Sequence, residues 1–195
     1  MNIEGKKFLV VGTGISGIAA TELLVKKNLE VLLYDGNEAL EEQEIREKSP
    51  LLKDVEIVLG ELPEEKMKSC QIAVLSPGVP TDIPVVIQMR EAGLQIWGEI
   101  ELAYHFEKGK VLAITGTNGK TTTTALLGEI MKNYCEKVQV VGNIGIPYTS
   151  VVTDTDESSV TVAEISSFQL ETVHEFCPEV SAILNITPDL SLIHI

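Results

Sequence analysis

The stretch VLAITGTNGKTTTTALLGEIM, residues 111–131, constrains the fold more than any other part of the sequence. An apolar run of strand length leads into a loop with two glycines, and a helical pattern follows the lysine of that loop. Glycines allow the backbone to curl so that successive N–H groups point inward, and the positive end of the following helix favours an anion there. The stretch therefore predicts a buried strand, a phosphate-binding loop and a helix, as in an α/β fold.

The loop departs from the strict pattern G-x-x-x-x-G-K-[ST], because Ile114 stands where the first glycine is required. Lys120 would neutralise the outer phosphates of a nucleoside triphosphate, and the hydroxyl of Thr121 can reach Mg²⁺. We therefore predict that ATP is bound by Gly116, Thr117, Asn118, Gly119, Lys120, Thr121 and Thr122. The alternative is a tight turn between a strand and a helix, with an exposed lysine.

A second glycine-rich loop, GTGISG at residues 12–17, lies near the start of the chain. It matches G-x-G-x-x-G between an apolar run and a helical pattern, and Asp35 ends the next apolar run at about the spacing of a ribose-binding carboxylate. From these residues alone the loop could hold NAD, FAD or a nucleotide sugar. A tight structural turn is the remaining alternative.

Apolar runs of strand length alternate with helical patterns along the chain, which predicts parallel sheets with helices on their faces. In the first half, strands are expected at 7–12, 30–35, 55–60, 71–76 and 94–97, and helices at 18–27, 38–48 and 83–93. In the second half, a helix at 98–106 precedes strands that begin near 111 and lie at 138–142, 160–165 and 180–187, with a polar loop at 153–159. The predicted fold class is α/β. A Rossmann-like parallel-sheet domain is expected at residues 1–97, followed at 98–195 by a P-loop ATPase domain with too few strands to be complete.

Charge and composition exclude several classes of protein. The formal net charge of −14 argues against binding to nucleic acid or to an anionic membrane, because both are negatively charged. The first residues lack the long apolar region of a signal peptide, and no apolar run approaches the roughly 18 residues that span a bilayer. The three cysteines, Cys70, Cys135 and Cys177, match no zinc or redox spacing. We therefore expect a reduced, cytoplasmic protein without membrane insertion.

Six motifs follow one another along the chain. They are GTGISG at 12–17, LSPGVP at 75–80, TGTNGKTTT at 115–123, GNIGIP at 142–147, EISSFQLE at 164–171 and NITPD at 185–189. In this order they resemble the Mur ligases of peptidoglycan synthesis, and the SSFQLE stretch is similar to that of the branch that adds D-glutamate. The resemblance implies the first domain of the family and roughly the first half of its central, P-loop-containing ATPase domain.

The resemblance also implies site residues, and it assigns the first loop to uridine diphosphate rather than to a dinucleotide. The residues then expected around the UDP substrate are Gly14, Ile15, Ser16 and Asp35, with Gly78 lining the same pocket, together with Asn143 and Ser166. Thr121 and Glu164 are expected to bind magnesium, a hard cation that prefers oxygen ligands, and Lys120 and Glu164 to be catalytic. Structural roles remain open: a strand-end acid for Glu164, a turn residue for Asn143 and a helix cap for Ser166.

The implied reaction is an ADP-forming ligation in peptidoglycan synthesis, and hence in cell-wall biogenesis, cell shape and cell division. ATP, with Mg²⁺, would phosphorylate the alanyl carboxylate of UDP-N-acetylmuramoyl-L-alanine, and the amine of D-glutamate would then displace the phosphate. These small molecules are the expected partners, without nucleic acid, and the whole enzyme is expected to be a monomer. The protein would contribute mainly alignment and charge neutralisation.

The resemblance breaks after Asp189. The family continues there with a histidine, whereas this chain continues LSLIHI, so that His194 stands four residues late. The modified lysine and the carboxyl-terminal domain of the family also have no counterpart in the 195 residues. We therefore expect a truncated chain that is inactive by itself.

Two other classes of protein remain open. One is a nucleotide sensor whose first half binds NAD, for which Asp35 is suited, fused to a P-loop NTPase. The other is a P-loop NTPase or kinase with an appended domain, in which the strand at 160–165 would be expected to end in aspartate rather than Glu164.

Overall fold

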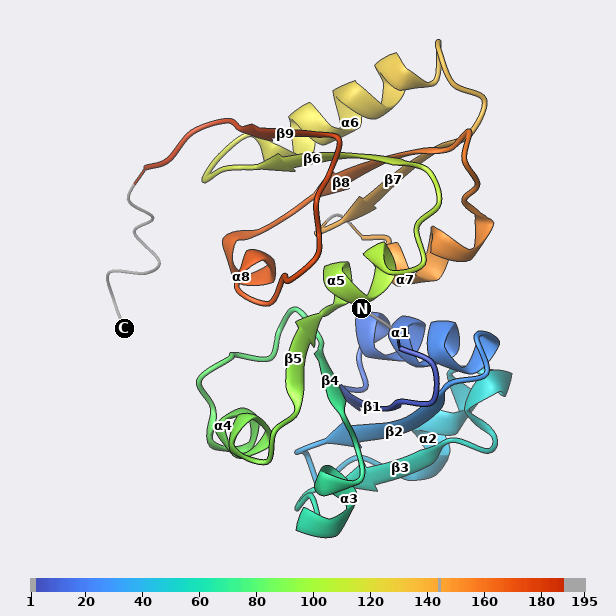
Figure 1. Cartoon of the computed structure of the whole chain (residues 1–195), viewed down its shortest axis with the longest axis vertical. Coiled ribbons are helices and arrows are strands. Elements are labelled where there is room, and N and C mark those ends of the chain that lie inside the picture. The colour runs from blue at the N-terminus through green and yellow to red at the C-terminus, as the bar shows by residue number, and fades with distance from the viewer. Residues whose placement is uncertain (1–2, 144, 188–195) are drawn as a thin grey trace.

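The computed structural model describes residues 3–143 and 145–187 of the chain, which form two parallel sheets flanked by helices (Figure 1). The first sheet has the strand order β3-β2-β1-β4-β5. Its strands are β1 (Lys7–Val11), β2 (Glu30–Asp35), β3 (Glu56–Leu59), β4 (Ile72–Leu75) and β5 (Gln95–Gly98). Its helices are α1 (Ile15–Lys26), α2 (Glu42–Glu47), α3 (Glu64–Lys68) and α4 (Pro84–Glu91), with a 3-10 turn at Pro50–Leu52.

The second sheet has four strands in the order β7-β8-β6-β9, all pairing in parallel. These are β6 (Lys110–Thr115), β7 (Val138–Gly142), β8 (Val160–Glu164) and β9 (Val180–Ile183). Helix α5 (Glu99–Tyr104) leads into this sheet, and α6 (Lys120–Met131), α7 (Tyr148–Val151) and α8 (Ser167–Leu170) follow, with a 3-10 turn at Val152–Asp154. The predicted α/β class with parallel sheets is confirmed.

The central strands form because their apolar side chains are covered on both faces, as parallel sheets require. All four residues of β4 are buried, as are all of β8, including its terminal Glu164. Each of these strands ends at the same edge of its sheet as its parallel neighbours. The loops that follow β1, β4, β6 and β8 therefore gather at the carboxyl edges, where α/β proteins bind ligands.

Helix α1 begins at Ile15, earlier than the start predicted at residue 18. Ile15 is 77% exposed, so it does not belong to the buried apolar face whose periodicity predicts the helix. The first turn therefore gives no signal in that pattern. Gly17 allows this turn to pack closely on the loop, since a Cβ atom there would lie 1.9 Å from the carbonyl oxygen of Gly12. The glycine therefore permits a close backbone approach between the loop and the helix.

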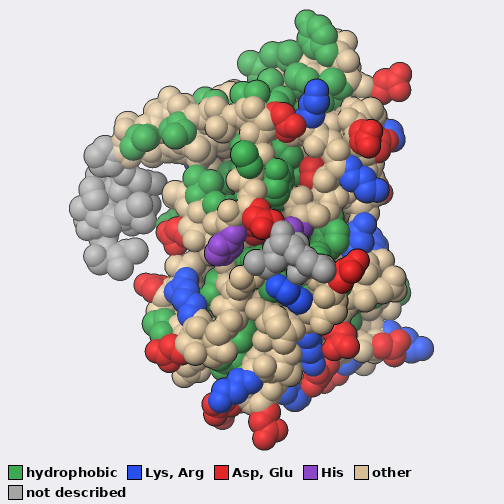
Figure 2. Space-filling view, in the orientation of Figure 1, with side chains coloured by type: hydrophobic (Ala, Val, Ile, Leu, Met, Phe, Trp, Pro, Cys, Tyr) green, Lys and Arg blue, Asp and Glu red, His purple; other side chains and the backbone are tan. Residues whose placement is uncertain are grey.

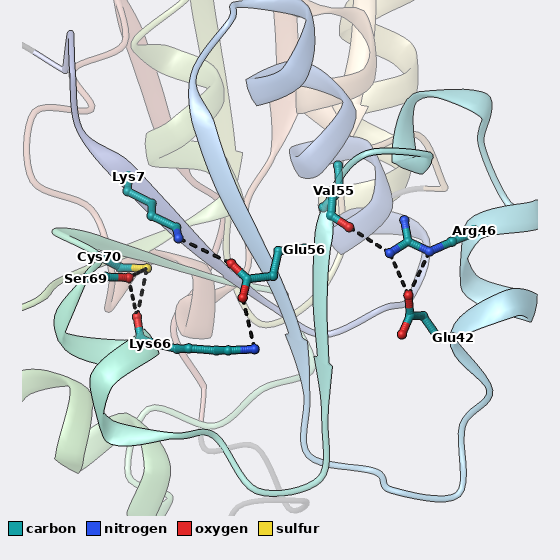
Figure 3. Close-up of polar contacts among 8 residues, drawn as sticks. All are labelled: Lys7, Glu42, Arg46, Val55, Glu56, Lys66, Ser69 and Cys70. Atoms are coloured by element: carbon teal, nitrogen blue, oxygen red, sulfur yellow. Dashed lines mark hydrogen bonds and ion pairs between the residues drawn. The ribbon is translucent and has the colours of Figure 1, made fainter.

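Helix α2 is shorter than the helix predicted at 38–48, and β9 is shorter than the strand predicted at 180–187. Before α2, the side chain of Asn37 accepts a hydrogen bond from the N–H of Ala39 at 3.0 Å, which makes a turn instead of a helical start. Arg46 in α2 then donates to the carboxylate of Glu42 and to the carbonyl oxygen of Val55 (Figure 3), so it ties the helix to the segment before β3. In the same view, Glu56 of β3 forms ion pairs with Lys7 and Lys66.

One hydrophobic cluster continues from the first sheet to the helices of the second half. Phe8 of β1 and Trp97 of β5 contact edge to face, with ring centroids 6.2 Å apart, and Ile100 and Tyr148 belong to the same cluster. Helices α1, α5 and α7 contact one another in this region (Figure 1). The division into two domains at residues 97 and 98 stays a prediction.

Exposed apolar side chains lie on α6 and just beyond it. Leu126 and Ile130 of the helix and Tyr134 after its end are exposed, and Figure 2 shows hydrophobic side chains gathered at the end of the molecule that carries this helix. None of the helices among the described residues is both long enough and apolar enough to cross a bilayer.

Candidate functional site

The phosphate loop at residues 116–119 joins β6 to α6, as predicted. Gly116 and Gly119 have φ values of +144° and +83°, which side chains with a Cβ rarely adopt. The loop borders a cavity of about 610 Å³. The cavity is lined by the loop and Lys120, and also by Asn143 after β7, Ser166 before α8, and the segment after β9. The fold thus brings residues from the GNIGIP, EISSFQLE and NITPD motifs to the loop.

Lys120, the first residue of α6, folds back over the loop. Its Nζ donates to the carbonyl oxygens of Gly116 at 2.7 Å and Thr117 at 3.2 Å. The ammonium group is therefore held beside the backbone where a phosphate is expected. Thr121 and Thr122 follow in the first turn of α6 and are exposed, so their hydroxyls and N–H groups are accessible.

Two N–H groups of the loop are already used. Those of Thr117 and Asn118 donate to the backbone and side-chain oxygens of Asn185, at 3.1 and 2.9 Å. They are therefore directed at the segment after β9, and the N–H groups from Gly119 onward are the ones left for an anion. Asn185 was not singled out from the sequence as a site residue. Its only signal was its place at the start of the NITPD motif.

Glu164 ends β8 directly beside the loop. In the strand register it is aligned with Ile114 of β6 and Gly142 of β7, and it is only 1% exposed. Its Oε1 accepts a hydrogen bond from Asn143 Nδ2 at 3.0 Å, whereas its Oε2 is buried without a hydrogen-bond partner among the described residues. An unpartnered buried carboxylate oxygen is costly, so this position favours a cation.

The oxygen donors that this chain supplies beside the loop are suitable ligands for Mg²⁺. Glu164 offers a free carboxylate oxygen, and Thr121 offers an exposed hydroxyl at the start of α6. No group of three or more His, Cys, Asp or Glu side chains that could hold a metal occurs within residues 3–143 and 145–187. Mg²⁺ at a nucleotide is commonly bound through one or two protein oxygens and completes its shell with phosphate and water, so two oxygen donors from this chain would be enough.

Ser166 caps α8. Its Oγ accepts from the N–H of Gln169 at 3.3 Å, and Gln169 Oε1 accepts from the N–H of Ser166 at 3.0 Å, which makes a capping box. Ser166 also lines the cavity beside the phosphate loop. The structural reading of this serine is therefore correct, and its place at the cavity leaves a binding role open.

The first glycine loop borders a separate cavity of about 470 Å³, which includes Gly14, Ile15, Lys48 and residues around α7. Lys48 Nζ donates to the carbonyl oxygen of Thr13 at 2.9 Å. This lysine places a positive charge beside the loop. The sequence gives no sign of this role, because Lys48 ends a charged helical pattern that matches no motif.

Asp35 stabilises the backbone around the first glycine loop by hydrogen bonds. Its Oδ2 accepts from the N–H and the hydroxyl of Thr13, at 2.9 and 2.8 Å, and its Oδ1 accepts from the N–H of Asn37 at 3.0 Å. Both carboxylate oxygens therefore already serve the conformation of the protein. Ser16, which belongs to the same glycine-rich motif, lies in the first turn of α1.

Gly78 is not among the residues that border the cavity of the first loop, and its predicted place at the UDP substrate stays a prediction. It borders a third cavity, of about 220 Å³, with Thr81, Glu99 and α8. The loop containing it still contacts the glycine loop, because Ser76 Oγ lies 2.7 Å from where a Cβ of Gly12 would stand. Val79 of the same turn also approaches Gly12, with its Cγ2 3.8 Å from that position. Phe168 borders both this third cavity and the cavity of the phosphate loop.

Buried carboxylates of α5 tie this helix to later segments of the second half. Glu99 Oε1 accepts from the N–H and hydroxyl of Thr149 at 2.7 and 2.9 Å, and burial raises the pKa of Glu99 even though these donors act to lower it. Burial also acts to raise the pKa of Glu101, but His105 and the N–H groups of residues 174–176 overcome it and lower the pKa to about 2. The predicted departure of the sequence after Asp189, including His194, lies outside the described residues.

Sequence comparisons identify relatives of both halves. The family profile described as "Mur ligase MurD-like, N-terminal domain" matches residues 6–98, and that of the "Mur ligase middle domain" matches residues 114–190. A UDP-N-acetylmuramoylalanine--D-glutamate ligase from Lachnospira eligens is 58% identical over 189 residues, which are 97% of this chain and 42% of that protein. The enzyme of that name from Caldanaerobacter subterraneus subsp. tengcongensis is 47% identical over 191 residues, with the same shares of the two chains. The chain thus spans less than half the length of these relatives.

Solved structures show the same fold at low identity. A murein peptide ligase from Psychrobacter arcticus matches with a TM-score of 0.55 and 17% identity, over 95% of this chain and 44% of that one. A UDP-N-acetylmuramate:L-alanyl-gamma-D-glutamyl-meso-diaminopimelate ligase from Neisseria meningitides matches with a TM-score of 0.55 and 14% identity, over 95% of this chain and 62% of that one. The two family profiles together cover most of the sequence, in the order in which the two sheets occur. The chain belongs to the Mur ligase family.

Proposed function

We propose that this chain is the UDP-substrate-binding and ATP-binding part of a ligase that adds D-glutamate to UDP-N-acetylmuramoyl-L-alanine with formation of ADP. Relatives that are 58% and 57% identical to it carry the name of that enzyme. Because the chain spans 42% of their length, ligation is proposed for the whole protein. For the 195 residues by themselves, we propose nucleotide binding without turnover.

The observation that carries the proposal is that Lys120, after the loop that follows β6, and Glu164, at the end of the neighbouring strand β8, lie at the same edge of the sheet. Lys120 supplies a cation held over the loop, and Glu164 supplies a buried oxygen without a partner. A nucleoside triphosphate needs both a lysine for its outer phosphates and an oxygen ligand for its Mg²⁺. A structural turn with an exposed lysine would require neither.

The residues of the chain then act mainly by positioning. Lys120 exchanges the carbonyl oxygens of Gly116 and Thr117 for phosphate oxygens, and the N–H groups at the start of α6 add further donors. When bound at Glu164 and Thr121, Mg²⁺ would neutralise phosphate charge. Asn143 orients Glu164 by donating to its other oxygen, which leaves Oε2 directed at the cation.

The proposed chemistry has two steps. A carboxylate oxygen of the substrate attacks the γ-phosphorus of ATP, the bond to the β-γ bridging oxygen breaks, and ADP leaves. The amine nitrogen of D-glutamate then attacks the acyl carbon, phosphate leaves, and the amine loses a proton. Phosphorylation is needed because a carboxylate is a poor electrophile, whereas an acyl phosphate has a good leaving group.

For the first loop we propose a UDP substrate rather than NAD. Asp35, at the end of the second strand, already accepts three protein hydrogen bonds, which leaves its Oδ1 with room for one more donor from either ligand. Lys48, beside Gly14 and Ile15, adds a cation that suits a diphosphate. The nucleotide-sensor alternative, in which the first half binds NAD, has less support because the relatives of this domain are named for a UDP compound.

Calorimetry with the 195-residue chain tests the proposal. We expect heat of binding with UDP-N-acetylmuramoyl-L-alanine and, separately, with Mg·ATP, and none with NAD. Binding of NAD without any response to the UDP compound would favour the sensor alternative. Phosphate release in the presence of both substrates and D-glutamate should stay at background, and rapid turnover would contradict the proposal that this part only binds.

A further inference from the structure

We propose that Asn185 is a positioning residue that sets the orientation of three successive peptide groups in the phosphate loop. Asn185 lies two residues beyond the end of β9 and is half-buried against the loop. The part of this inference that concerns ATP rests on the function proposed above. The part that concerns the loop conformation depends only on the contacts described here.

Asn185 makes three hydrogen bonds with the loop. Its carbonyl oxygen accepts from the N–H of Thr117 at 3.1 Å, and its Oδ1 accepts from the N–H of Asn118 at 2.9 Å. Its Nδ2 donates to the carbonyl oxygen of Asn118 at 2.9 Å. The side-chain amide thus both accepts from and donates to the backbone of one loop residue, which is a reciprocal pair. Thr187 adds two further bonds to the hydroxyl of Thr117, at 3.1 and 3.2 Å.

These contacts determine where the opposite ends of the same peptide groups point. In a trans peptide the C=O and the N–H point in opposite directions, and none of the described peptide bonds is cis. The N–H groups of Thr117 and Asn118 point toward Asn185. The carbonyl oxygens of Gly116 and Thr117, which belong to those peptide groups, therefore point away from it. Both accept from Lys120 Nζ, at 2.7 and 3.2 Å.

The third peptide group is turned the other way. Its carbonyl oxygen, on Asn118, points toward Asn185 Nδ2. Its N–H, on Gly119, therefore points away from Asn185. Gly119 is the residue before the first turn of α6, so this N–H joins the donors at the positive end of the helix. One asparagine thereby places the lysine of the loop and fixes the direction of its first free N–H group.

The close approach between the loop and Asn185 also explains why residue 116 is a glycine. A Cβ atom on Gly116 would lie 3.2 Å from both the backbone nitrogen and the backbone oxygen of Asn185, so a side chain there would push the two segments apart. The loop lacks the first glycine of the strict pattern, at Ile114. A residue from outside the loop therefore provides part of its conformation.

The test uses the 195-residue chain with Asn185→Ala, Asn185→Asp and a matched control, Asn133→Ala. Asn133 also donates its side-chain amide to a backbone carbonyl, that of Glu129 at 2.9 Å, but it lies at the far end of α6. Amide hydrogen exchange is followed residue by residue by NMR, and the affinity for Mg·ATP is measured by calorimetry. The exchange measurement tests the loop conformation without reference to function.

In Asn185→Ala we expect the amide of Asn118 to exchange at least about tenfold faster and the Kd for Mg·ATP to rise about tenfold, because two side-chain hydrogen bonds are lost. Asn185→Asp keeps Oδ1 and loses the donor. It should retain protection at Asn118 while the amide resonance of Gly119 shifts. The added negative charge would itself weaken ATP binding, so affinity is compared only for Asn185→Ala. Asn133→Ala should resemble the wild type in both measurements.

Unchanged exchange at Asn118 in Asn185→Ala, with the strands still protected, would overturn the proposal. If Asn185→Ala does not fold, Asn185→Asp decides, since equal effects at Asn118 and Gly119 would contradict separate control of the two peptide groups. If the wild type binds no Mg·ATP, the proposed function fails, while the exchange data still decide the role of Asn185. Faster exchange with unchanged ATP affinity would refute the link between this residue and the nucleotide.

Discussion

Replacing Glu164 with glutamine should stabilise the isolated chain and remove its response to magnesium. In the structure this carboxylate is 1% exposed, and its Oε2 has no hydrogen-bond partner among the described residues. A buried polar group without a partner costs about 1–3 kcal/mol, and more when it is charged. Glutamine keeps the acceptor for Asn143, and the neutral amide nitrogen that replaces Oε2 costs less to bury without a partner than the charged oxygen does.

We therefore expect Glu164→Gln to gain about 2 kcal/mol in the free energy of unfolding without metal, which corresponds to a Tm rise of roughly 4–8 °C for a chain of this length. Addition of Mg²⁺ should raise the Tm of the wild type, because a ligand that binds only the folded state stabilises it. The variant should show no such rise. Thermal unfolding followed by circular dichroism, with EDTA or with Mg²⁺, measures both effects.

The exposed residue Glu157 offers a matched control. Glu157→Gln should unfold near the wild-type temperature and keep the response to Mg²⁺. The reasoning would be refuted if Glu164→Gln were less stable than the wild type in EDTA, since the carboxylate would then be satisfied by contacts that the structure does not show. It would also be refuted if the variant kept the full response to Mg²⁺.

Three other predictions concern stability. Glu101→Gln should lose on the order of 3 kcal/mol near neutral pH, because the pKa of Glu101 is lowered from 4.5 to about 2 and each unit corresponds to about 1.4 kcal/mol. The wild type should lose that stability as the pH falls from 4.5 to 2, and denaturant unfolding across this range should show a flatter profile for the variant. Glu99→Gln should instead raise the free energy of unfolding at neutral pH, because burial raises the pKa of Glu99 and its ionised form destabilises the fold as the pH rises. A free energy of unfolding at neutral pH below that of the wild type would contradict this. Gly17→Ala should cost about 2 kcal/mol or more, because its Cβ would lie 1.9 Å from the carbonyl oxygen of Gly12, whereas Gly14→Ala, with open space around it, should leave the Tm almost unchanged.

Much of the fold was predictable because its signals are local. The buried strands are short apolar runs, and the two glycine loops mark where a strand gives way to a helix. Gly93, with φ of +88°, ends the segment of α4 where the sequence pattern placed the stop. These features depend on residues that are neighbours in the chain, so a single sequence is enough to reveal them.

The features that were missed depend on contacts between distant segments. Asn185 contacts Asn118, which lies 67 residues earlier, and Lys48 contacts Thr13, which lies 35 residues earlier. Nothing in the local pattern around either residue shows these partners. Gly78 was assigned to the pocket of the first loop, and in the structure it borders a different cavity together with α8. The turn before α2 was missed because the side chain of Asn37 competes with the helix for backbone hydrogen bonds.

The central claim is that each half of the chain holds a different nucleotide. A crystal structure of the 195-residue chain with UDP-N-acetylmuramoyl-L-alanine and a non-hydrolysable Mg·ATP analogue tests it most directly. We expect the diphosphate at Gly14, Ile15 and Lys48, and the triphosphate at the loop of residues 116–119, with Lys120 Nζ moved from its carbonyl oxygens to a phosphate oxygen. A triphosphate bound elsewhere while Lys120 keeps its contacts with Gly116 and Thr117, or an empty first loop, would contradict the account.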